Sequence, residues 1–367
     1  MKIAHFGPFA PWLAGIYEAA RDMVKADIGQ GHDAVFVDVG KTKKDGVHQP
    51  PQVGAIDDRA GFPLQTVSFE AALDTDVLVM HQSAPDNWLV RTSSPIIWML
   101  HGRPLASFRP EQKGVPGNTY THTRELANWP RVRRMVTLWP EHVPFWQVLV
   151  PEEKLVCIGP PPVDRDRFSP DGPRHDFGGR AGKWNILIAD TWRDDVDIFE
   201  VAHAPLLLAE RRPGLKVHFC AVEQPFGPWN SIFDAYDRLG IKGHLYERVA
   251  NIDQLYRASD LLLTPHRIAT RTMAECLSCG TPVVAAEPCS HTRYSGIPEA
   301  PETMAAAIAH ALDAGDVARA AALEAADAFG LEAFGQKMNA VYERALAGEP
   351  SPTGARSGSA SLPDPPG

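Results

Sequence analysis

The stretch TPHRIATRTMAECLSCGTPVVA, residues 264–285, predicts a short helix that is followed at once by a buried strand. Thr272 and Glu275 are spaced as in a capping box, in which a hydroxyl and a carboxylate each satisfy a backbone N–H group at a helix start. Gly280 is typical of a helix end, and the apolar run Pro282–Ala286 favours a strand. Glu275 therefore has two interpretations: it caps the helix, or it binds a ligand.

Length and composition favour a globular protein with two domains. The chain has 367 residues, and one domain usually takes roughly 100–200. Hydrophobic residues make up 44% of the chain, which is enough for packed cores. The net charge is −9, so no overall positive field favours a nucleic-acid partner. The basic cluster Arg131–Arg134 leads into a predicted strand, and we interpret it as the solvated entry of that strand.

The cysteines and the N-terminus indicate a cytoplasmic protein. Five cysteines, an odd number, favour reduced thiols over a disulfide framework. Cys276 and Cys279 match the C-x-x-C pattern, but no second pair completes a zinc site, so we interpret both as packing residues. The N-terminal MKIAHFG predicts a strand rather than a secretory signal. No apolar run reaches the roughly 18 residues that a membrane helix needs.

Short apolar runs alternate with helical patterns along the first half of the chain. This alternation is typical of a parallel sheet that has helices on both faces. The helix expected after the first strand has Ile16, Ala20, Met23 and Val24 on one side. The strands expected in this half are Lys2–Phe6, Ala34–Val39, Val77–Met80, Ile96–Leu100, Met135–Leu138 and Leu155–Ile158.

The same alternation restarts after residues 159–183, where proline, glycine and charged residues predict an interdomain linker. We expect an N-terminal domain at 1–165, a second domain at 180–330 and a disordered tail at 348–367. A capping box at Asn251–Gln254 is expected to start one helix. The strands expected in the second domain are Ile186–Ala189, Lys216–Cys220, His244–Glu247, Leu261–Thr264 and Pro282–Ala286.

Polar residues follow several of these strands directly. His101 comes after the strand Ile96–Leu100, and the segment Asp190–Arg193 comes after Ile186–Ala189. Ligands of open α/β sheets bind at the carboxyl ends of the strands, so we expect these residues and the opening stretch to face one cleft. The loop after the first strand lacks G-x-G-x-x-G, which disfavours a redox dinucleotide cofactor.

These segments resemble the retaining glycosyltransferases of the GT-B fold, of the family-four and glycogen-synthase-like type. ECLSCGTPVVA resembles the family's EAMACG.PVVA, and LYRASDLLLTP before it resembles lY..aDv.v.PS. PWLAGIYEAA is similar to the family's P..GG loop, with Ala14 in place of the first glycine. The resemblance implies an α/β protein with two Rossmann-like, doubly wound parallel-sheet domains that face a cleft. It also implies a C-terminal helix, at about 331–347, that packs back on the first domain. Further similar segments are GHDAVFV, WMLHGRP and KLVCIGPPPVDRDRF.

The resemblance implies a binding site for a nucleotide-diphosphate sugar, with no separate cofactor and no metal ion. The diphosphate would bind at the helix start, around Thr270, Arg271 and Thr272, where free N–H groups and the helix dipole favour an anion. Arg193 matches the family's arginine after the first strand of the second domain and would donate a charge-assisted hydrogen bond to the diphosphate. Glu275 would bind the ribose hydroxyls.

Three further residues have implied roles. His101 corresponds to the family's histidine near the donor sugar and the reacting centre, although a hydrogen-bonded histidine at a strand end is the plainer interpretation. Gly15 would let the backbone approach the donor closely, and an ordinary turn before a helix is the alternative. Arg248, at the end of the strand His244–Glu247, is expected near the base.

The sequence departs from the family pattern in the same region. The family has a second glutamate eight positions before the one that matches Glu275, and Arg267 stands there. The segment is also two residues shorter than the family pattern, so His266 is the other candidate for that place. The lysine expected shortly after Arg193 is missing, and we hypothesise that Arg267 and Arg271 partly supply its charge.

The sequence thus predicts a cytoplasmic glycosyltransferase that acts with retention, without metal, and on a carbohydrate or glycolipid acceptor. One alternative is a DNA acceptor, a hydroxylated base held along Arg103, Arg109, Lys113 and Arg131–Arg134. A second alternative is a non-catalytic protein that binds nucleotide sugars. A sugar-nucleotide epimerase on the same fold is the third.

Overall fold

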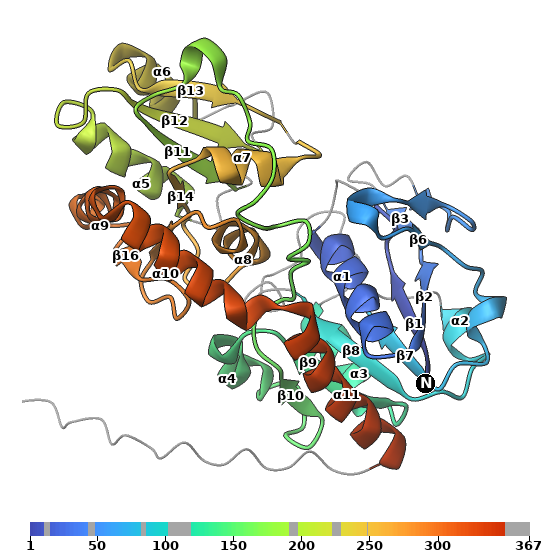
Figure 1. The fold of residues 1–367 in the computed structure, drawn as a ribbon. Coiled ribbons are helices and arrows are strands. Elements are labelled where there is room, and N and C mark those ends of the chain that lie inside the picture. The colour runs from blue at the N-terminus through green and yellow to red at the C-terminus, as the bar shows by residue number, and fades with distance from the viewer. Residues whose placement is uncertain are drawn as a thin grey trace, which may run out of the picture.

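The computed structural model has two lobes, and each is built on a six-stranded parallel sheet (Figure 1). Helices cover both faces of each sheet, as the alternation of strands and helices predicts. None of the described helices is long and apolar enough to cross a membrane. The structure describes residues 1–10, 15–42, 48–81, 86–101, 119–190, 197–221, 229–247 and 249–348.

The first sheet has the strand order β10-β9-β8-β7-β1-β2, and all neighbouring strands are parallel. The strand order reverses between β1 and β7, which makes this the switch point at which open α/β sheets bind ligands. All six strands were predicted, although β9 begins at Val132 rather than at Met135. The strands are β1 Lys2–Gly7, β2 Asp33–Asp38, β7 Val77–Met80, β8 Ile96–Leu100, β9 Val132–Thr137 and β10 Leu155–Cys157.

The second sheet has the order β13-β12-β11-β14-β15-β16, also with all neighbours parallel. Its switch point lies between β11 and β14. The strand β16 was not predicted, because three residues that include a glycine are too short to show a periodicity. The strands are β11 Trp184–Ala189, β12 Leu215–Cys220, β13 Lys242–Leu245, β14 Leu261–Leu263, β15 Val283–Ala286 and β16 Tyr294–Gly296.

Helices and short strands complete both lobes. Two small antiparallel pairs flank the first sheet: β3 Lys41–Thr42 with β4 His48–Gln49, and β5 Ile56–Asp57 with β6 Leu64–Gln65. The α-helices are α1 Gly15–Gly29, α2 Asp86–Leu89, α3 Thr119–Asn128, α4 Val143–Trp146, α5 Ile198–His203, α6 Asn230–Arg238, α7 Ile252–Ala258, α8 Arg271–Ser278, α9 Pro301–Ala314, α10 Asp316–Ala326 and α11 Leu331–Ala347. The 3-10 helices include η4 Pro140–His142, η5 Gly178–Arg180 and η6 Ala204–Leu208.

Successive residues of the central strands pack into cores on opposite faces of each sheet. In β11, Ile186 and Ile188 belong to the core under α5 and α9, whereas Leu187 and Ala189 belong to the core under α7 and α8. Side chains of a strand alternate between faces, and both faces of a parallel sheet are covered. For this reason the strands read as continuous apolar runs rather than as an alternating pattern.

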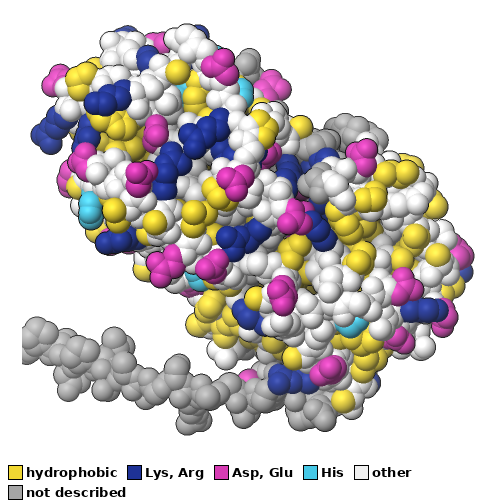
Figure 2. All heavy atoms as spheres, viewed as in Figure 1, with side chains coloured by type: hydrophobic (Ala, Val, Ile, Leu, Met, Phe, Trp, Pro, Cys, Tyr) yellow, Lys and Arg dark blue, Asp and Glu magenta, His cyan; other side chains and the backbone are white. Residues whose placement is uncertain are grey.

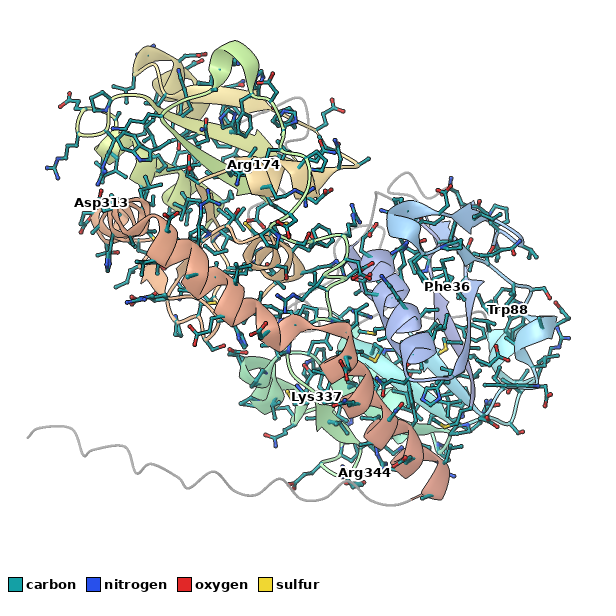
Figure 3. All side chains as sticks on the ribbon, viewed as in Figure 1. Phe36, Trp88, Arg174, Asp313, Lys337 and Arg344 are labelled. Carbon is teal, nitrogen blue, oxygen red and sulfur yellow. The ribbon has the colours of Figure 1, made fainter. Side chains whose placement is uncertain are left out.

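The C-terminal helix α11 returns to the first lobe, as predicted. Met338, Val341 and Tyr342 are buried against the first sheet and α1. Figure 1 shows α10 lying along the second lobe and α11 along the first, and Figure 3 labels Lys337 and Arg344 on α11. The helix pair therefore joins the two lobes a second time, besides the segment at residues 159–183.

The segment 159–183 connects β10 to β11 but is packed rather than loose. Phe168 and Phe177 are buried in the core of the second lobe. Val163 pairs with Gly330 in an isolated parallel bridge, which places the two connections between the lobes side by side. The two connections therefore hold each other in place at the boundary between the lobes.

The basic cluster at Arg131–Arg134 differs from its predicted role. Arg134 is 3% exposed, and it donates to the backbone carbonyls of Arg133 and Arg344 at 2.7 and 3.3 Å. Arg131 donates to the carbonyls of Leu89 and Ser94. The interpretation as a solvated strand entry is therefore wrong for Arg134, which lies inside β9 because the strand begins earlier than predicted. Arg131 directly precedes β9 and is partly buried. Figure 2 shows basic side chains interspersed with acidic ones on the face in view.

The predicted packing role of the C-x-x-C cysteines is confirmed. Cys276 and Cys279 are buried in the core between α8 and the second sheet. Burial raises the pKa of Cys279 to about 12 and raises the pKa of Cys276 well above its ordinary value. Both thiols therefore stay protonated at neutral pH, which disfavours reactivity.

Candidate functional site

The helix α8 starts two residues earlier than the sequence predicts. Thr270 is the N-cap: its backbone is extended, and its hydroxyl accepts the N–H of Met273 at 3.3 Å. Thr272 lies inside the first turn and Glu275 in the second, so the predicted capping box is wrong. Thr270 takes this position because its extended backbone aims the hydroxyl at the third helical N–H group. At α7, Asn251 is the N-cap as expected, but its side chain makes no capping hydrogen bond within the described residues.

Glu275 lies at the boundary between the lobes, in an ion pair with Arg271. Oε1 of Glu275 accepts Nε of Arg271 at 2.6 Å, and Oε2 accepts the hydroxyl of Tyr256 at 3.3 Å. Glu275 is 8% exposed, and burial raises the pKa of its carboxyl while the Arg271 guanidinium opposes that shift. The carboxylate is therefore held in one orientation next to a permanent positive charge.

The guanidinium of Arg271 also reaches the first lobe. Nη2 of Arg271 donates to Oδ2 of Asp22 on α1 at 2.7 Å, and Nη1 donates to the carbonyl of Pro162 at 3.2 Å. Nearby, Nε1 of Trp139 in the first lobe donates to the carbonyl of Ala269 at 2.8 Å. The start of α8 and the loop before it therefore lie on the side of the second lobe that contacts the first.

A histidine–aspartate pair lies at the switch point of the second sheet. Asp190 follows β11 and His266 follows β14; Nε2 of His266 is 2.9 Å from Oδ1 of Asp190. The hydroxyl of Thr264 donates to Oδ2 of Asp190 at 2.9 Å. A carboxylate can only accept hydrogen bonds, so Nε2 of His266 carries a hydrogen. The aspartate therefore orients the imidazole at the edge where such sheets bind ligands.

Arg267, the neighbour of His266, points elsewhere. Its guanidinium is exposed and pairs with Glu299 at 3.1 Å and with Asp197 at 3.5 Å. His266 is 8% exposed, so the two candidates for the place of the family's first glutamate occupy different environments. His266 lies at the switch point, and Arg267 lies on the surface.

His101 lies at the end of β8 in the first lobe, as predicted. Its Nε2 is 2.7 Å from Nδ1 of His81, which directly follows β7. Burial lowers the pKa of His101 to about 4, so the ring is neutral at neutral pH. His81 was not predicted as a site residue. The signal was present, because His81 ends the run VLVMH just as His101 ends the run IIWMLH.

The other predicted residues are placed as follows. Gly15 is the first residue of α1, and among the described residues no atom lies within 4 Å of the position that a Cβ would take. Arg193 and Arg248 lie outside the described residues. Asp22 was missed, because a single aspartate on the buried side of an amphipathic helix carries no sequence signal of its own.

No protein-family model matches the sequence, and no curated protein matches it. Solved structures do match the fold. HepE of Anabaena, in complex with UDP and glucose, is 15% identical, with a TM-score of 0.67 over 93% of this chain and 99% of its own. A sucrose-phosphate synthase from Thermosynechococcus elongatus is 13% identical, with a TM-score of 0.67 over 95% of this chain and all of its own. A glycosyltransferase from Rickettsia africae is 14% identical, with a TM-score of 0.62 over 94% and 98%. With its two parallel-sheet lobes, the chain has the GT-B fold of these glycosyltransferases.

Proposed function

We propose that the protein transfers a sugar from a nucleotide-diphosphate sugar to an acceptor hydroxyl, with retention of the anomeric configuration and without a metal ion. The observation that carries the proposal is the pair Asp190–His266 at the switch point of the second sheet. This pair adjoins the loop that leads into α8, and that loop contacts the first lobe through Trp139. The fold shared with glycosyltransferases supports the same reaction class.

The start of α8 is the proposed diphosphate site. The first N–H groups of a helix have no acceptor within the helix, and the helix dipole adds partial positive charge there. Thr270 satisfies the N–H of Met273, which leaves the N–H groups of Arg271 and Thr272 for an anion. Arg193, in the loop after β11, would add a charge-assisted hydrogen bond of about 1.5–3 kcal/mol.

The other proposed contacts to the nucleotide sugar follow from placing the diphosphate at the start of α8. Glu275 would accept a ribose hydroxyl, since each carboxylate oxygen has two lone pairs and Arg271 and Tyr256 occupy one on each. Arg248 would lie near the base. His266, held by Asp190, takes the place of the family's first glutamate at the hydroxyls of the donor sugar.

Catalysis in this proposal rests on positioning and on charge stabilisation. The bond from the anomeric carbon to the diphosphate oxygen breaks, and the acceptor oxygen bonds to the same face of that carbon. The acceptor proton leaves with the diphosphate. His101 of the first lobe would position the donor sugar at the reacting centre.

A carbohydrate or glycolipid is the proposed acceptor. A DNA acceptor needs a track of basic side chains for the phosphates. Arg131 and Arg134 do not offer one, because their guanidinium groups donate to backbone carbonyls within the fold. Arg103, Arg109 and Lys113 lie outside the described residues.

The test begins with nucleotide binding, measured as thermal shifts with UDP, GDP, ADP and TDP. A ligand at about 100 times its Kd stabilises the folded state by about 2.7 kcal/mol. We expect the largest shift with UDP, because the similar HepE structure holds UDP. Turnover of the matching nucleotide sugar, with and without EDTA, then tests transfer and metal independence. An absence of any shift would contradict the donor site.

The products separate the proposal from its alternatives. A glycosylated acceptor with the donor's anomeric configuration, detected by NMR, supports the proposal. Binding without product or donor hydrolysis would favour a non-catalytic binding protein. Release of an altered nucleotide sugar in the absence of an acceptor would indicate an epimerase.

A further inference from the structure

A chain of hydrogen bonds runs from His101 into the first lobe. Nε2 of His101 is 2.7 Å from Nδ1 of His81, and Nε2 of His81 is 2.9 Å from Nδ1 of His5. Nε2 of His5 is 2.8 Å from Oδ2 of Asp27 on α1. Tyr342 on α11 donates its hydroxyl to the same oxygen at 2.8 Å. The chain therefore links the end of β8 to the C-terminal helix.

The inner part of this chain is sealed from solvent. His5 is 0%, Asp27 1% and His81 3% exposed. His5 lies on β1 and His81 directly follows β7, so both stand at the switch point of the first sheet. Oδ1 of Asp27 is buried and accepts no hydrogen bond from the described residues. A buried carboxylate oxygen without a partner is costly, and a positive charge placed next to it reduces that cost.

The carboxylate sets the direction of every hydrogen bond in the chain. Asp27 can only accept, so Nε2 of His5 carries the hydrogen, and Nδ1 of the neutral ring accepts from Nε2–H of His81. By the same argument, Nδ1 of His81 accepts from Nε2–H of His101. The three neutral rings therefore share one tautomer, in which His101 keeps a lone pair on Nδ1.

We infer that Asp27, His5 and His81 are positioning residues that set the tautomer of His101 and relay its proton to a site beside Asp27. The inference rests on the proposed function, because it assigns a chemical state to a residue of the proposed reacting centre. His101 thereby offers an acceptor nitrogen to a hydroxyl of the sugar or of the acceptor, rather than an N–H group.

The proton transfer balances in atoms and charge. A proton binds Nδ1 of His101, whose Nε2–H moves to Nδ1 of His81; the Nε2–H of His81 then moves to Nδ1 of His5. Two N–H bonds break and three form, which accounts for the one proton taken up. The positive charge ends on His5, against the Asp27 carboxylate, while His81 and His101 are neutral again with their hydrogen on Nδ1.

The surrounding groups favour this placement of the charge. Burial lowers the pKa of His81 well below its ordinary value, and the neighbouring His101 and His5 lower it further. Burial and the Asp27 charge raise the pKa of Tyr342 well above its ordinary value, so its hydroxyl stays a donor. His32 lies beyond Tyr342, with the two rings 6.1 Å apart. Of the three histidines in this series of hydrogen bonds, His5 is the one that contacts a carboxylate of the described residues.

The first test uses the nucleotide-free protein. Nitrogen-15 NMR of the histidine rings reports which ring nitrogen carries hydrogen. At about pH 7.5, above the ordinary histidine pKa, we expect His101 to have a protonated Nε2 and an unprotonated Nδ1. A hydrogen on Nδ1 of His101 would overturn the inference. On acidification, the same spectra show where the proton settles, and a doubly protonated His101 would overturn the relay.

Matched variants distinguish an effect on the direction of the hydrogen bonds from a general loss of packing. Asp27→Asn introduces an amide that can also donate, so we expect mixed tautomers at His101, and an unchanged single tautomer would overturn the inference. Tyr342→Phe removes a donor but leaves the carboxylate, so the wild-type tautomer should persist. His5→Gln keeps a donor and an acceptor in place but cannot take up the proton. It should retain the tautomer of His101, and it serves as the second test if Asp27→Asn does not fold.

Kinetics then connect the relay to the reaction. We expect Asp27→Asn to lower kcat by about tenfold or more and to leave UDP affinity within about twofold, since His101 is placed at the sugar and not at the nucleotide. Equal kcat values for the wild type and Asp27→Asn would overturn the positioning role of Asp27. If no donor is turned over while the NMR states are as expected, the proposed function fails and the relay stands.

Discussion

At the scale of single residues, two neighbours in the chain lie in different environments. His266 and Arg267 are both candidates for the place of the missing glutamate, and the structure gives them different partners. His266 meets Asp190 at the switch point, whereas Arg267 pairs with Glu299 and Asp197 at the surface. The two side chains also differ in burial, since His266 is buried and Arg267 is exposed.

We expect His266→Asn to lower kcat/KM for the nucleotide sugar by up to about tenfold, the effect of losing one hydrogen bond between neutral groups. Arg267→Ala is the matched control and should change kcat/KM by about twofold at most, since exposed ion pairs contribute about 0–1 kcal/mol. Steady-state kinetics on both variants test this. Equal losses in the two variants would contradict the assignment.

A second expectation at this scale concerns acid stability. His218 is fully buried, and burial with its histidine neighbours lowers its pKa to about 3. In the unfolded chain a histidine takes up a proton near pH 6.5, so below that pH the unfolded state binds more protons. The contribution of His218 to the free energy of unfolding is constant above about pH 6.5. Below that pH, it lowers the free energy of unfolding by about 1.4 kcal/mol for each pH unit, down to about pH 3.

Urea denaturation between about pH 8 and about pH 5, on either side of the histidine pKa, measures this slope. His218→Gln removes the titrating group and should give a shallower decline than the wild type. Parallel curves for the two proteins would show that His218 does not contribute to the acid sensitivity.

At the scale of elements, α8 depends on one cap. Thr270 is the residue whose hydroxyl accepts the third helical N–H, and Thr272 lies within the first turn. The sequence contains both threonines at plausible spacings, and the backbone conformation of Thr270 selects between them. The same start supplies the N–H groups that the proposed diphosphate needs, so the cap and the ligand share one helix end.

We expect Thr270→Ala to lower the free energy of unfolding by about 1 kcal/mol, as the loss of an N-cap does. Thr272→Ala should change it by less than about 0.5 kcal/mol, because alanine is at least as favourable inside a helix. Equilibrium urea denaturation distinguishes them. A larger loss in the Thr272 variant would restore the capping box that the sequence predicts.

At the scale of the whole molecule, Arg271 joins the two lobes. One guanidinium bonds to Glu275 on its own helix, to Asp22 on α1 and to the carbonyl of Pro162 in the connecting segment. A planar guanidinium holds five N–H donors in a fixed fork on three nitrogens and so reaches acceptors on different sides, whereas the three donors of an ammonium group radiate from a single nitrogen. The contact between the lobes is therefore stabilised by this side chain as well as by α10 and α11.

We expect Arg271→Lys to lower the free energy of unfolding by about 1.5–3 kcal/mol, the contribution of a hydrogen bond to a charged group. Arg267→Lys, four residues earlier and exposed, should have almost no effect on stability. Calorimetry of both variants measures the difference. A wild-type Tm for Arg271→Lys would show that the contact between the lobes does not depend on the guanidinium geometry.

Apolar periodicity, a local property, already specified most of the architecture. It predicts eleven of the twelve strands of the two sheets and the helix α1, because side-chain spacing within a segment follows its own backbone geometry. The return of the C-terminal helix was implied by the family resemblance and not by periodicity. Strand ends also located His101, His266 and Asp190. The hydrogen-bond partners of buried side chains could not be predicted from such local patterns. Asp27 and Tyr342 are 315 residues apart in the chain, yet they share a hydrogen bond. Folding alone brings such residues together, since the contacts that orient His101 and Arg271 form between elements, where sequence spacing carries no information.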